Sequence, residues 1–328
     1  MKVVFMGTGR LGSYCLSSLA EDNFFDVVVI TQPDSLKDRG HRLKPSYVKQ
    51  LALEKNLKFY QPKKLDKDFF ENYFIKEKPH ITLVADYGLK IPNRILEFPI
   101  HGCVNVHPSL LPRYRGAAPV NWTLIRGERK TGVTTIMMDQ GWDSGDILLQ
   151  ESTPIYHHEN AGILLERLSK IAAKLLVETA YGLYENKIER KKQDHSIATF
   201  APFLKKDDGL INWSEGAEQI VNLVKGLTPY PGTYTYYKDK MLKILKVEQV
   251  DLRNNGFKNP DCGEVVTADS KKGLFIKSGT DSFVSIIELQ PAGKRGITWK
   301  QFLSGYRIKA GNMFKEKPEK SLFKLTKG

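Results

Sequence analysis

The chain has 328 residues, of which 41% are hydrophobic, so it is long enough for two globular domains and its composition excludes an intrinsically disordered protein. Its three cysteines, Cys15, Cys103 and Cys262, are odd in number and widely spaced, which excludes a disulfide framework and a zinc site and indicates a reducing compartment. The formal net charge of +13 favours a polyanionic partner, although solvated surface lysines would produce the same balance.

Strand-like and helix-like segments alternate over the first 200 residues. Apolar runs predict strands at 2–6, 26–31, 81–85, 102–107, 133–138 and 147–150. Amphipathic patterns predict helices at 13–22, 45–55, 119–126 and 161–186. This alternation is typical of an α/β fold with a Rossmann-like, doubly wound parallel sheet.

The pattern changes after a basic stretch near residue 200. One helix is expected at 214–225, with Ser214 as its N-cap. Short runs at 233–237, 242–247, 263–268, 274–277 and 283–289 predict a small, OB-like β-barrel. We therefore expect an α/β domain over residues 1–205 and a C-terminal β-barrel domain over residues 206–328.

No signal for membrane insertion or export accompanies these elements. No apolar stretch approaches the roughly 20 residues of a membrane span. The few residues before Gly7 are too short for a signal peptide. We expect a protein of the cytoplasm, with the bacterial cytosol favoured, that binds no membrane.

The first expected strand leads into the hexapeptide GTGRLG, residues 7–12, which has the spacing of a dinucleotide-binding fingerprint. The acidic residue that usually holds the ribose belongs at the end of the second strand. That strand instead ends in Thr31, Gln32 and Pro33, and Asp34 lies beyond the proline. The motif alone leaves two readings open: an NADP-dependent oxidoreductase, or glycines that only permit a tight turn and close helix packing.

A more specific stretch, GCVNVHPSLLPRYRGAAP, covers residues 102–119. Asn105 and His107 project to the same side of its strand, at the edge where open α/β sheets bind ligands. The later segment MMDQGWDSGDIL supplies Asp139, Asp143 and Asp146. A carboxylate beside the amide and the imidazole would complete a proton-handling site. The alternatives are a buried histidine held by an amide, and aspartates that only form turns.

The motifs HPSLLPRYRGAAP and DQGWDSGD resemble those of the folate-dependent formyltransferases, which move a formyl group from 10-formyltetrahydrofolate to an amine. The resemblance implies a catalytic trio of Asn105, His107 and Asp143. It implies that NAD(P) is not bound and that no metal is needed, although these relatives often carry proline where Gly9 stands. It also implies folate contacts from two segments, namely Ser109, Leu110, Leu111 and Pro112, and Gly88, Leu89 and Ile91.

Three further stretches, at 31–52, 211–234 and 289–308, resemble the branch of this family that formylates initiator methionyl-tRNA for translation initiation. A basic loop follows the second expected strand and should emerge at the ligand-binding edge of the sheet. Its candidate tRNA-binding residues are Lys37, Arg39, Arg42 and Lys44.

The basic C-terminal domain is also consistent with a polyanionic substrate, although such a domain could serve only packing or dimerisation. We expect a monomer. Two alternatives are a sugar-nucleotide N-formyltransferase and a non-catalytic nucleic-acid-binding protein.

Overall fold

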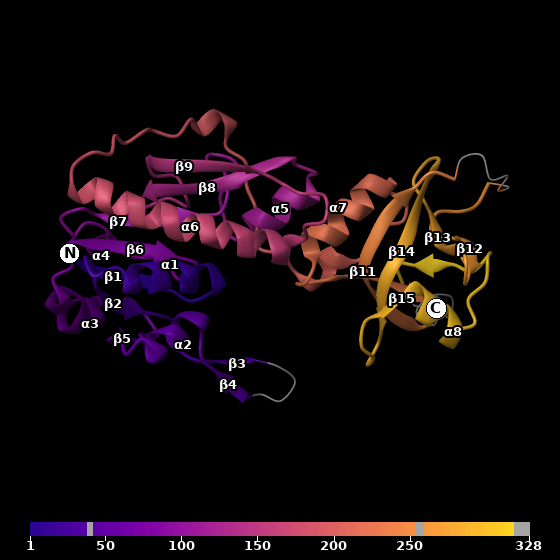
Figure 1. The fold of residues 1–328 in the computed structure, drawn as a ribbon, viewed down its shortest axis with the longest axis horizontal. Coiled ribbons are helices and arrows are strands. Elements are labelled where there is room, and N and C mark those ends of the chain that lie inside the picture. Colours follow the sequence, from indigo (N-terminus) through magenta and orange to yellow (C-terminus); the bar gives the residue numbers. More distant parts are fainter. Residues whose placement is uncertain (38–41, 253–256, 258, 318–328) are drawn as a thin grey trace, which may run out of the picture. The chain divides into compact units, whose positions relative to one another are not determined.

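The computed structural model describes residues 1–37, 42–252, 257 and 259–317 (Figure 1). The chain divides into two compact units. The first unit comprises Met1–Pro119, Arg129–Tyr156 and Ile163–Pro202. The second comprises Val120–Glu128, His157–Gly162 and Phe203–Gly328. Two short segments from the first 200 residues therefore cluster with the C-terminal part of the chain.

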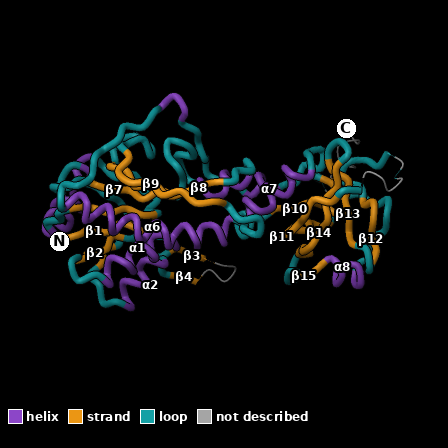
Figure 2. The backbone as a smooth tube through the Cα atoms, turned by 45° about the horizontal axis from the view of Figure 1, so that its top comes forward, coloured by secondary structure: helices purple, strands orange, loops and turns teal. Residues whose placement is uncertain are grey.

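A seven-stranded sheet forms the centre of the first unit (Figures 1 and 2), in the order β5-β2-β1-β6-β7-β8-β9. Every strand expected in this part of the sequence is present, and β5 is an addition of two residues. The bounds are β1 (Lys2–Gly7), β2 (Asp26–Ile30), β5 (Phe59–Tyr60), β6 (Ile81–Ala85), β7 (Cys103–His107), β8 (Lys130–Met137) and β9 (Ile147–Pro154).

The sheet is mixed rather than wholly parallel. Strands β5, β2, β1, β6 and β7 are parallel, whereas β8 is antiparallel to both β7 and β9. The connection from β8 to β9 contains no helix. A parallel crossover needs about a dozen residues and usually a helix. Because this connection is short and lacks a helix, β9 runs antiparallel to β8.

The two faces of this sheet are covered differently. The long helix α6 (Ala161–Tyr184) packs on one face, where the hydroxyl groups of Thr179 and Thr135 lie 2.8 Å apart. Helices α1 (Arg10–Glu21) and α2 (Tyr47–Glu54) are neighbours of each other, and α1 reaches α6 through the Tyr14–Glu166 hydrogen bond. The other face carries a buried apolar cluster with α3 (Lys67–Phe69) and α4 (Asn93–Leu96), which includes Met6, Val84, Ile91, Leu96 and Cys103.

Two smaller elements complete the first part of the chain. A hairpin of β3 (Ser35–Lys37) and β4 (Arg42–Lys44) follows β2. Helix α5 (Pro119–Ile125) follows the segment after β7. No helix among the described residues is both long enough and apolar enough to cross a bilayer.

The second unit is a curled antiparallel sheet in the order β12-β13-β14-β11-β10-β16, with β15 paired to β14. Its two edge strands meet through a bridge between Glu264 and Met313, which gives the sheet a barrel-like form. The α/β fold with a C-terminal barrel-like domain is therefore confirmed. The bounds are α7 (Ala217–Leu227), β10 (Thr233–Tyr237), β11 (Lys240–Val250), β12 (Val265–Asp269), β13 (Gly273–Ser278), β14 (Ser282–Pro291), β15 (Ile297–Thr298), α8 (Trp299–Gly305) and β16 (Phe314–Lys315).

The N-cap residue expected for the helix at 214–225, which is α7 in the structure, is wrong. Helix α7 begins at Ala217 and its N-cap residue is Gly216, not Ser214. The reason is local: the backbone N–H of Ser214 donates to Oδ1 of Asn212, and Glu215 closes a turn on the carbonyl of Asn212. The side chain of Asn212 therefore organises a turn before the helix.

Candidate active site

Three side chains that are distant in the sequence converge at β7. Asn105 and His107 lie two residues apart on this strand, and Asp143 comes from the loop between β8 and β9. Oδ1 of Asp143 accepts a hydrogen bond from Nδ2 of Asn105 at 3.3 Å. Oδ2 of Asp143 accepts the backbone N–H of Gly116 at 2.8 Å and lies 3.7 Å from Nδ1 of His107. The structure thus brings the expected trio together.

His107 is buried, with 4% of the residue's surface exposed. Its Nε2 atom lies 2.9 Å from the carbonyl oxygen of Tyr114. A carbonyl oxygen only accepts, so Nε2 donates to it and carries a hydrogen. The ring is thereby oriented with Nδ1 toward Asp143, as a histidine that moves a proton requires.

The residue types alone left three aspartates open in the loop between β8 and β9, the family resemblance implied Asp143, and the structure distinguishes them. Asp139 holds the loop together, since its Oδ1 accepts the N–H of Gly141 at 2.9 Å and the hydroxyl of Ser144 at 2.8 Å. The carbonyl of Asp146 accepts the N–H of Met137 at the base of the loop. Only Asp143, in a left-handed conformation with φ of 51°, directs its carboxylate to Asn105.

Sequence reasoning missed one residue that contacts this loop. Gln193 lies in the basic stretch after α6, and its Nε2 donates to the carbonyl oxygen of Asp143 at 2.8 Å. This stretch has no regular hydrophobic period, and its contacts reach residues about 50 positions away in the sequence. No local pattern could have identified it.

The segment 109–112 folds over β8, next to β7. The hydroxyl of Ser109 donates to the carbonyl of Arg113 at 2.7 Å. The backbone N–H of Leu111 donates to Oγ1 of Thr134 at 3.2 Å, and its carbonyl accepts from Gln150 at 3.0 Å. Thr134 pairs in register with His107, so this segment lies on the side of β7 that faces β8.

The segment 88–91 lies on the opposite side of β7. Ile91 is buried in the apolar cluster that also contains Val84 of β6 and Cys103 of β7. Leu89 is 36% exposed, and Gly88 has a left-handed backbone. Because β7 runs between β6 and β8, Asn105 and His107 lie between the two segments for which the resemblance implies folate contacts.

The glycine loop after β1 is covered by a carboxylate. Asp86 follows β6 with φ of 56°, and a Cβ atom on Gly9 would lie only 1.6 Å from Oδ2 of Asp86. Although part of Asp86 reaches solvent, the surrounding protein desolvates its carboxyl group and raises its pKa to about 6. A pyrophosphate would bind where this acidic group lies, at the N-terminus of α1.

Asp34, the nearest candidate for a ribose ligand, is already paired. Its Oδ2 lies 2.7 Å from Nζ of Lys49, and its Oδ1 accepts from Gln61 at 2.9 Å. The hydrogen bonds from Lys49 and Gln61 hold the pKa of this carboxyl group below its usual value. The two acids together argue against a nicotinamide dinucleotide at GTGRLG.

The basic loop is only partly described. Arg39 lies outside the described residues. Lys37 and Arg42 contribute their backbone to the β3–β4 hairpin, and Lys44 is exposed at its end. Their expected contacts with tRNA remain a prediction.

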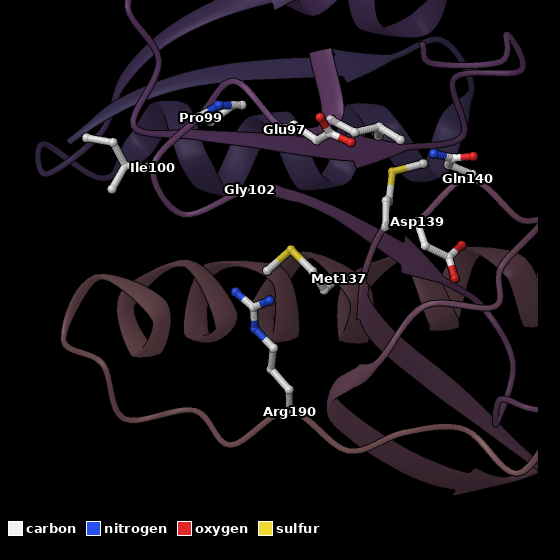
Figure 3. A pocket seen from close by; sticks show the side chains of 10 residues that line it. Glu97, Pro99, Ile100, Gly102, Met137, Asp139, Gln140 and Arg190 are labelled. Carbon is white, nitrogen blue, oxygen red and sulfur yellow. The ribbon is translucent and has the colours of Figure 1, made fainter. Parts of the chain in front are cut away.

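A cavity of about 490 Å³ lies near the beginning of β7 (Figure 3). Its lining includes Gly102, Met137, Asp139 and Arg190, but neither the expected trio nor the segment 109–112. It is therefore separate from the point where Asn105 and His107 meet Asp143. Among the described residues, no three His, Cys, Asp or Glu side chains are grouped as metal ligands would be.

Comparison with known proteins places both parts of the chain in one family. Residues 1–180 match the model of the formyl transferase family, and residues 204–307 match that of the formyl transferase C-terminal domain. A methionyl-tRNA formyltransferase from Caldanaerobacter subterraneus subsp. tengcongensis is 42% identical over 96% of this chain and 100% of its own length.

Two solved structures share the fold. The methionyl-tRNA formyltransferase from Clostridium thermocellum matches with a TM-score of 0.54 at 20% identity, over 80% of this chain and 95% of that one. An N-formyltransferase from Helicobacter canadensis, solved with folinic acid and dTDP-3-aminofucose, matches with a TM-score of 0.65 at 19% identity, over 89% of this chain and 99% of that one.

Proposed function

The chain belongs to the formyl transferase family, and from this membership we propose that it transfers a formyl group from 10-formyltetrahydrofolate to the α-amine of methionyl-tRNA. The product is N-formylmethionyl-tRNA, the aminoacyl-tRNA of translation initiation. A relative of that name, 42% identical over nearly the whole chain, supports this substrate. The observation that carries the chemistry is the convergence of Asn105, His107 and Asp143 at the end of a sheet strand.

The reaction is an acyl transfer through a tetrahedral intermediate. The neutral α-amine attacks the formyl carbon, a new C–N bond forms, and the bond from that carbon to N10 of the folate breaks. The carbonyl oxygen carries negative charge in between, and preorganised N–H groups stabilise such an oxyanion. The amide of Asn105 supplies one donor, and the imidazolium form of His107 supplies a charge-assisted second donor at Nδ1.

A proton also has to travel from the attacking amine to the leaving N10. Nδ1 of His107 and the carboxylate of Asp143 are the two groups that can carry it, since Nε2 is committed to the carbonyl of Tyr114. The carboxylate of Asp143 lies 3.7 Å from Nδ1, where it can exchange this proton with the ring. The groups together provide charge stabilisation and proton transfer without a covalent enzyme intermediate.

The folate donor and the tRNA bind to different segments of the protein. The apolar side chains of Ile91, Leu110 and Leu111 form walls for the pteridine ring, and backbone groups near Leu89 bind its polar edge. The basic residues Lys37, Arg39, Arg42 and Lys44 bind phosphates of the tRNA. We assign catalysis to residues 1–205 and tRNA binding to residues 206–328 together with this loop. The protein acts as a monomer in the cytosol.

The decisive experiment is an acceptor comparison. The purified protein is incubated with 10-formyltetrahydrofolate and, in parallel, methionyl-tRNA, free methionine and a dTDP-amino sugar, and the formylated products are quantified. We expect formylation of methionyl-tRNA and none of the other two. Transfer to the amino sugar alone would replace this function with that of a sugar-nucleotide N-formyltransferase.

Donor binding is tested separately by thermal unfolding. A folate analogue at about a hundredfold excess over its dissociation constant should stabilise the protein by about 2.7 kcal/mol. NADPH at the same concentration should leave the melting temperature unchanged. The reverse result would support a nicotinamide-dependent enzyme.

A further inference from the structure

Gln193 connects a buried arginine to the loop that carries Asp143. Its Nε2 donates to the carbonyl oxygens of Asp143 at 2.8 Å and of Gly145 at 2.7 Å. Its Oε1 accepts from Nε of Arg115 at 3.1 Å and from Nη2 of Arg115 at 2.7 Å. Gln193 and Arg115 are each 6% exposed, so water replaces none of these contacts easily.

The chemistry of an amide matches this position on both sides. A glutamine offers two N–H donors and one oxygen with two lone pairs. Here both donors have a carbonyl acceptor, and the oxygen takes two hydrogens of one guanidinium group. A carboxylate of the same size would pair with Arg115 but would place an oxygen against the two carbonyl oxygens. A methionine of similar length would satisfy neither side.

The segment that carries Gln193 is itself fixed on both sides of this residue. Lys191 and Ile147 exchange two backbone hydrogen bonds, at 2.8 and 2.9 Å. Further along the segment, the carbonyl of Thr199 accepts the backbone N–H of Arg115 at 2.9 Å, and the N–H of Ala201 donates to the carbonyl of Arg115 at 2.7 Å. The side chain of Gln193 therefore extends from a segment that backbone hydrogen bonds hold on both sides, and it binds the backbone of Asp143.

The position of that backbone matters because Asp143 reaches its partners from a left-handed conformation. Its carboxylate contacts Asn105 through one oxygen and Gly116 through the other, and Gly116 directly follows Arg115. The carbonyl of Asp143 is thus bound by Gln193, the partner of Arg115, and one carboxylate oxygen is bound by Gly116, the residue after Arg115. A shift of the loop would separate the carboxylate from Nδ1 of His107.

We propose that Gln193 is a positioning residue of the formyl-transfer reaction, which holds the backbone of Asp143 so that its carboxylate lies between Asn105 and His107. This inference rests on the function proposed above. It extends the site to a residue that does not touch the reacting atoms. Misplacement of a reacting group by about 1 Å can cost a hundredfold in rate.

The test compares Gln193→Glu and Gln193→Met with the wild-type protein in the methionyl-tRNA assay. We expect kcat to fall about tenfold to a hundredfold, whereas the KM values for the folate donor and for methionyl-tRNA stay within about twofold. The matched control is Gln61→Met, since Nε2 of Gln61 likewise donates to a backbone carbonyl, that of Gln32 at 2.9 Å, in the first unit but away from Asp143. It should keep the wild-type kcat.

A double-mutant cycle separates positioning from general destabilisation. In an Asp143→Ala background, Gln193→Glu should lower kcat no further, because the carboxylate that it positions is absent. Its effect on the melting temperature should persist in that background. If Gln193→Glu does not fold, the same cycle is measured with Gln193→Met.

The possible failures are distinguishable. A wild-type protein that does not formylate methionyl-tRNA overturns the proposed function. An active wild type with unchanged kcat in the Gln193 variants overturns only the positioning role. A reduction of kcat that is undiminished in the Asp143→Ala background also overturns it.

Discussion

Nδ1 of His107 lies 3.7 Å from Oδ2 of Asp143, which is too long for a direct hydrogen bond and leaves both atoms able to bind an incoming group. Nε2 of the same ring donates to the carbonyl of Tyr114 at 2.9 Å. The proton that His107 gains or loses is therefore the one on Nδ1. One ring nitrogen is thus held by a hydrogen bond to the backbone, and the other is available for proton transfer.

This arrangement predicts which tautomer the neutral imidazole adopts. In ¹⁵N NMR spectra recorded across the titration, Nε2 of His107 should keep the chemical shift of a protonated nitrogen, and Nδ1 should change. The exposed residue His157 is the internal comparison. A neutral His107 with its hydrogen on Nδ1 would contradict the hydrogen bond to Tyr114.

Removal of the polar side chain of Asn105 on β7, or of Asp143 in the loop after β8, should impair catalysis. We expect Asn105→Ala and Asp143→Ala each to lower kcat about a hundredfold or more, the usual scale for loss of an oxyanion donor or a proton relay. Folding should be retained, as checked by circular dichroism. Turnover near the wild-type value in either variant would exclude the proposed role of that residue.

The raised pKa of Asp86 predicts that the stability of the wild-type protein and that of a variant without this carboxyl group differ in a pH-dependent way. The pKa of Asp86 is raised from 3.8 to about 6, so the folded state binds a proton more tightly than the unfolded state. The stabilising contribution of this group is fully present below about pH 3.8 and is lost as the pH rises through about 6. Asp86→Asn should therefore melt at a higher temperature than the wild type at pH 7.5, and the difference should vanish near pH 4.

The control for this comparison is Asp281→Asn, since Asp281 is an exposed residue that also has a left-handed backbone. It should show no such pH-dependent difference. An Asp86→Asn variant whose difference from the wild type is the same at both pH values would show that the carboxyl group is not perturbed.

The basic loop predicts a salt-dependent contribution to tRNA binding. Arg39→Ala/Arg42→Ala should raise the KM for methionyl-tRNA strongly, because each lost phosphate contact reduces the salt slope by about one and weakens binding by about one to a few kcal/mol. Folate binding should be unaffected. The charge-matched control is Lys170→Ala/Lys174→Ala on α6.

If the double arginine variant retains the wild-type KM and salt slope, the loop has no part in tRNA recognition. Contact with tRNA would then depend on the second unit. If the lysine control has the same effect as the arginine variant, the loss reflects net charge rather than this loop.

Much of the architecture follows from patterns within short windows. Alternating apolar runs and amphipathic segments predicted the longer strands of both units, because side-chain burial repeats locally along strands and helices. The strands of two or three residues, namely β3, β4, β5, β15 and β16, are too short to show such a repeat and were not expected. The pairing of Asn105 with His107 is of the same kind, since residues two apart on a strand share a face. The start of α7 shows the limit of local reasoning: Ser214 is a suitable N-cap, but the side chain of Asn212 forms a turn there first.

The sequence by itself therefore determined the fold class, the strand that carries Asn105 and His107, and the family resemblance of its motifs. Only the tertiary structure showed how Asp143 reaches these two residues, that Gln193 contacts its loop, and that Asp86 covers the glycine loop at Gly9. These contacts join residues that are about 40 to 80 positions apart, as for Asn105 with Asp143 and Arg115 with Gln193. Local periodicity carries no information on such pairs, because they form only when the sheet and its loops bring distant backbone segments together.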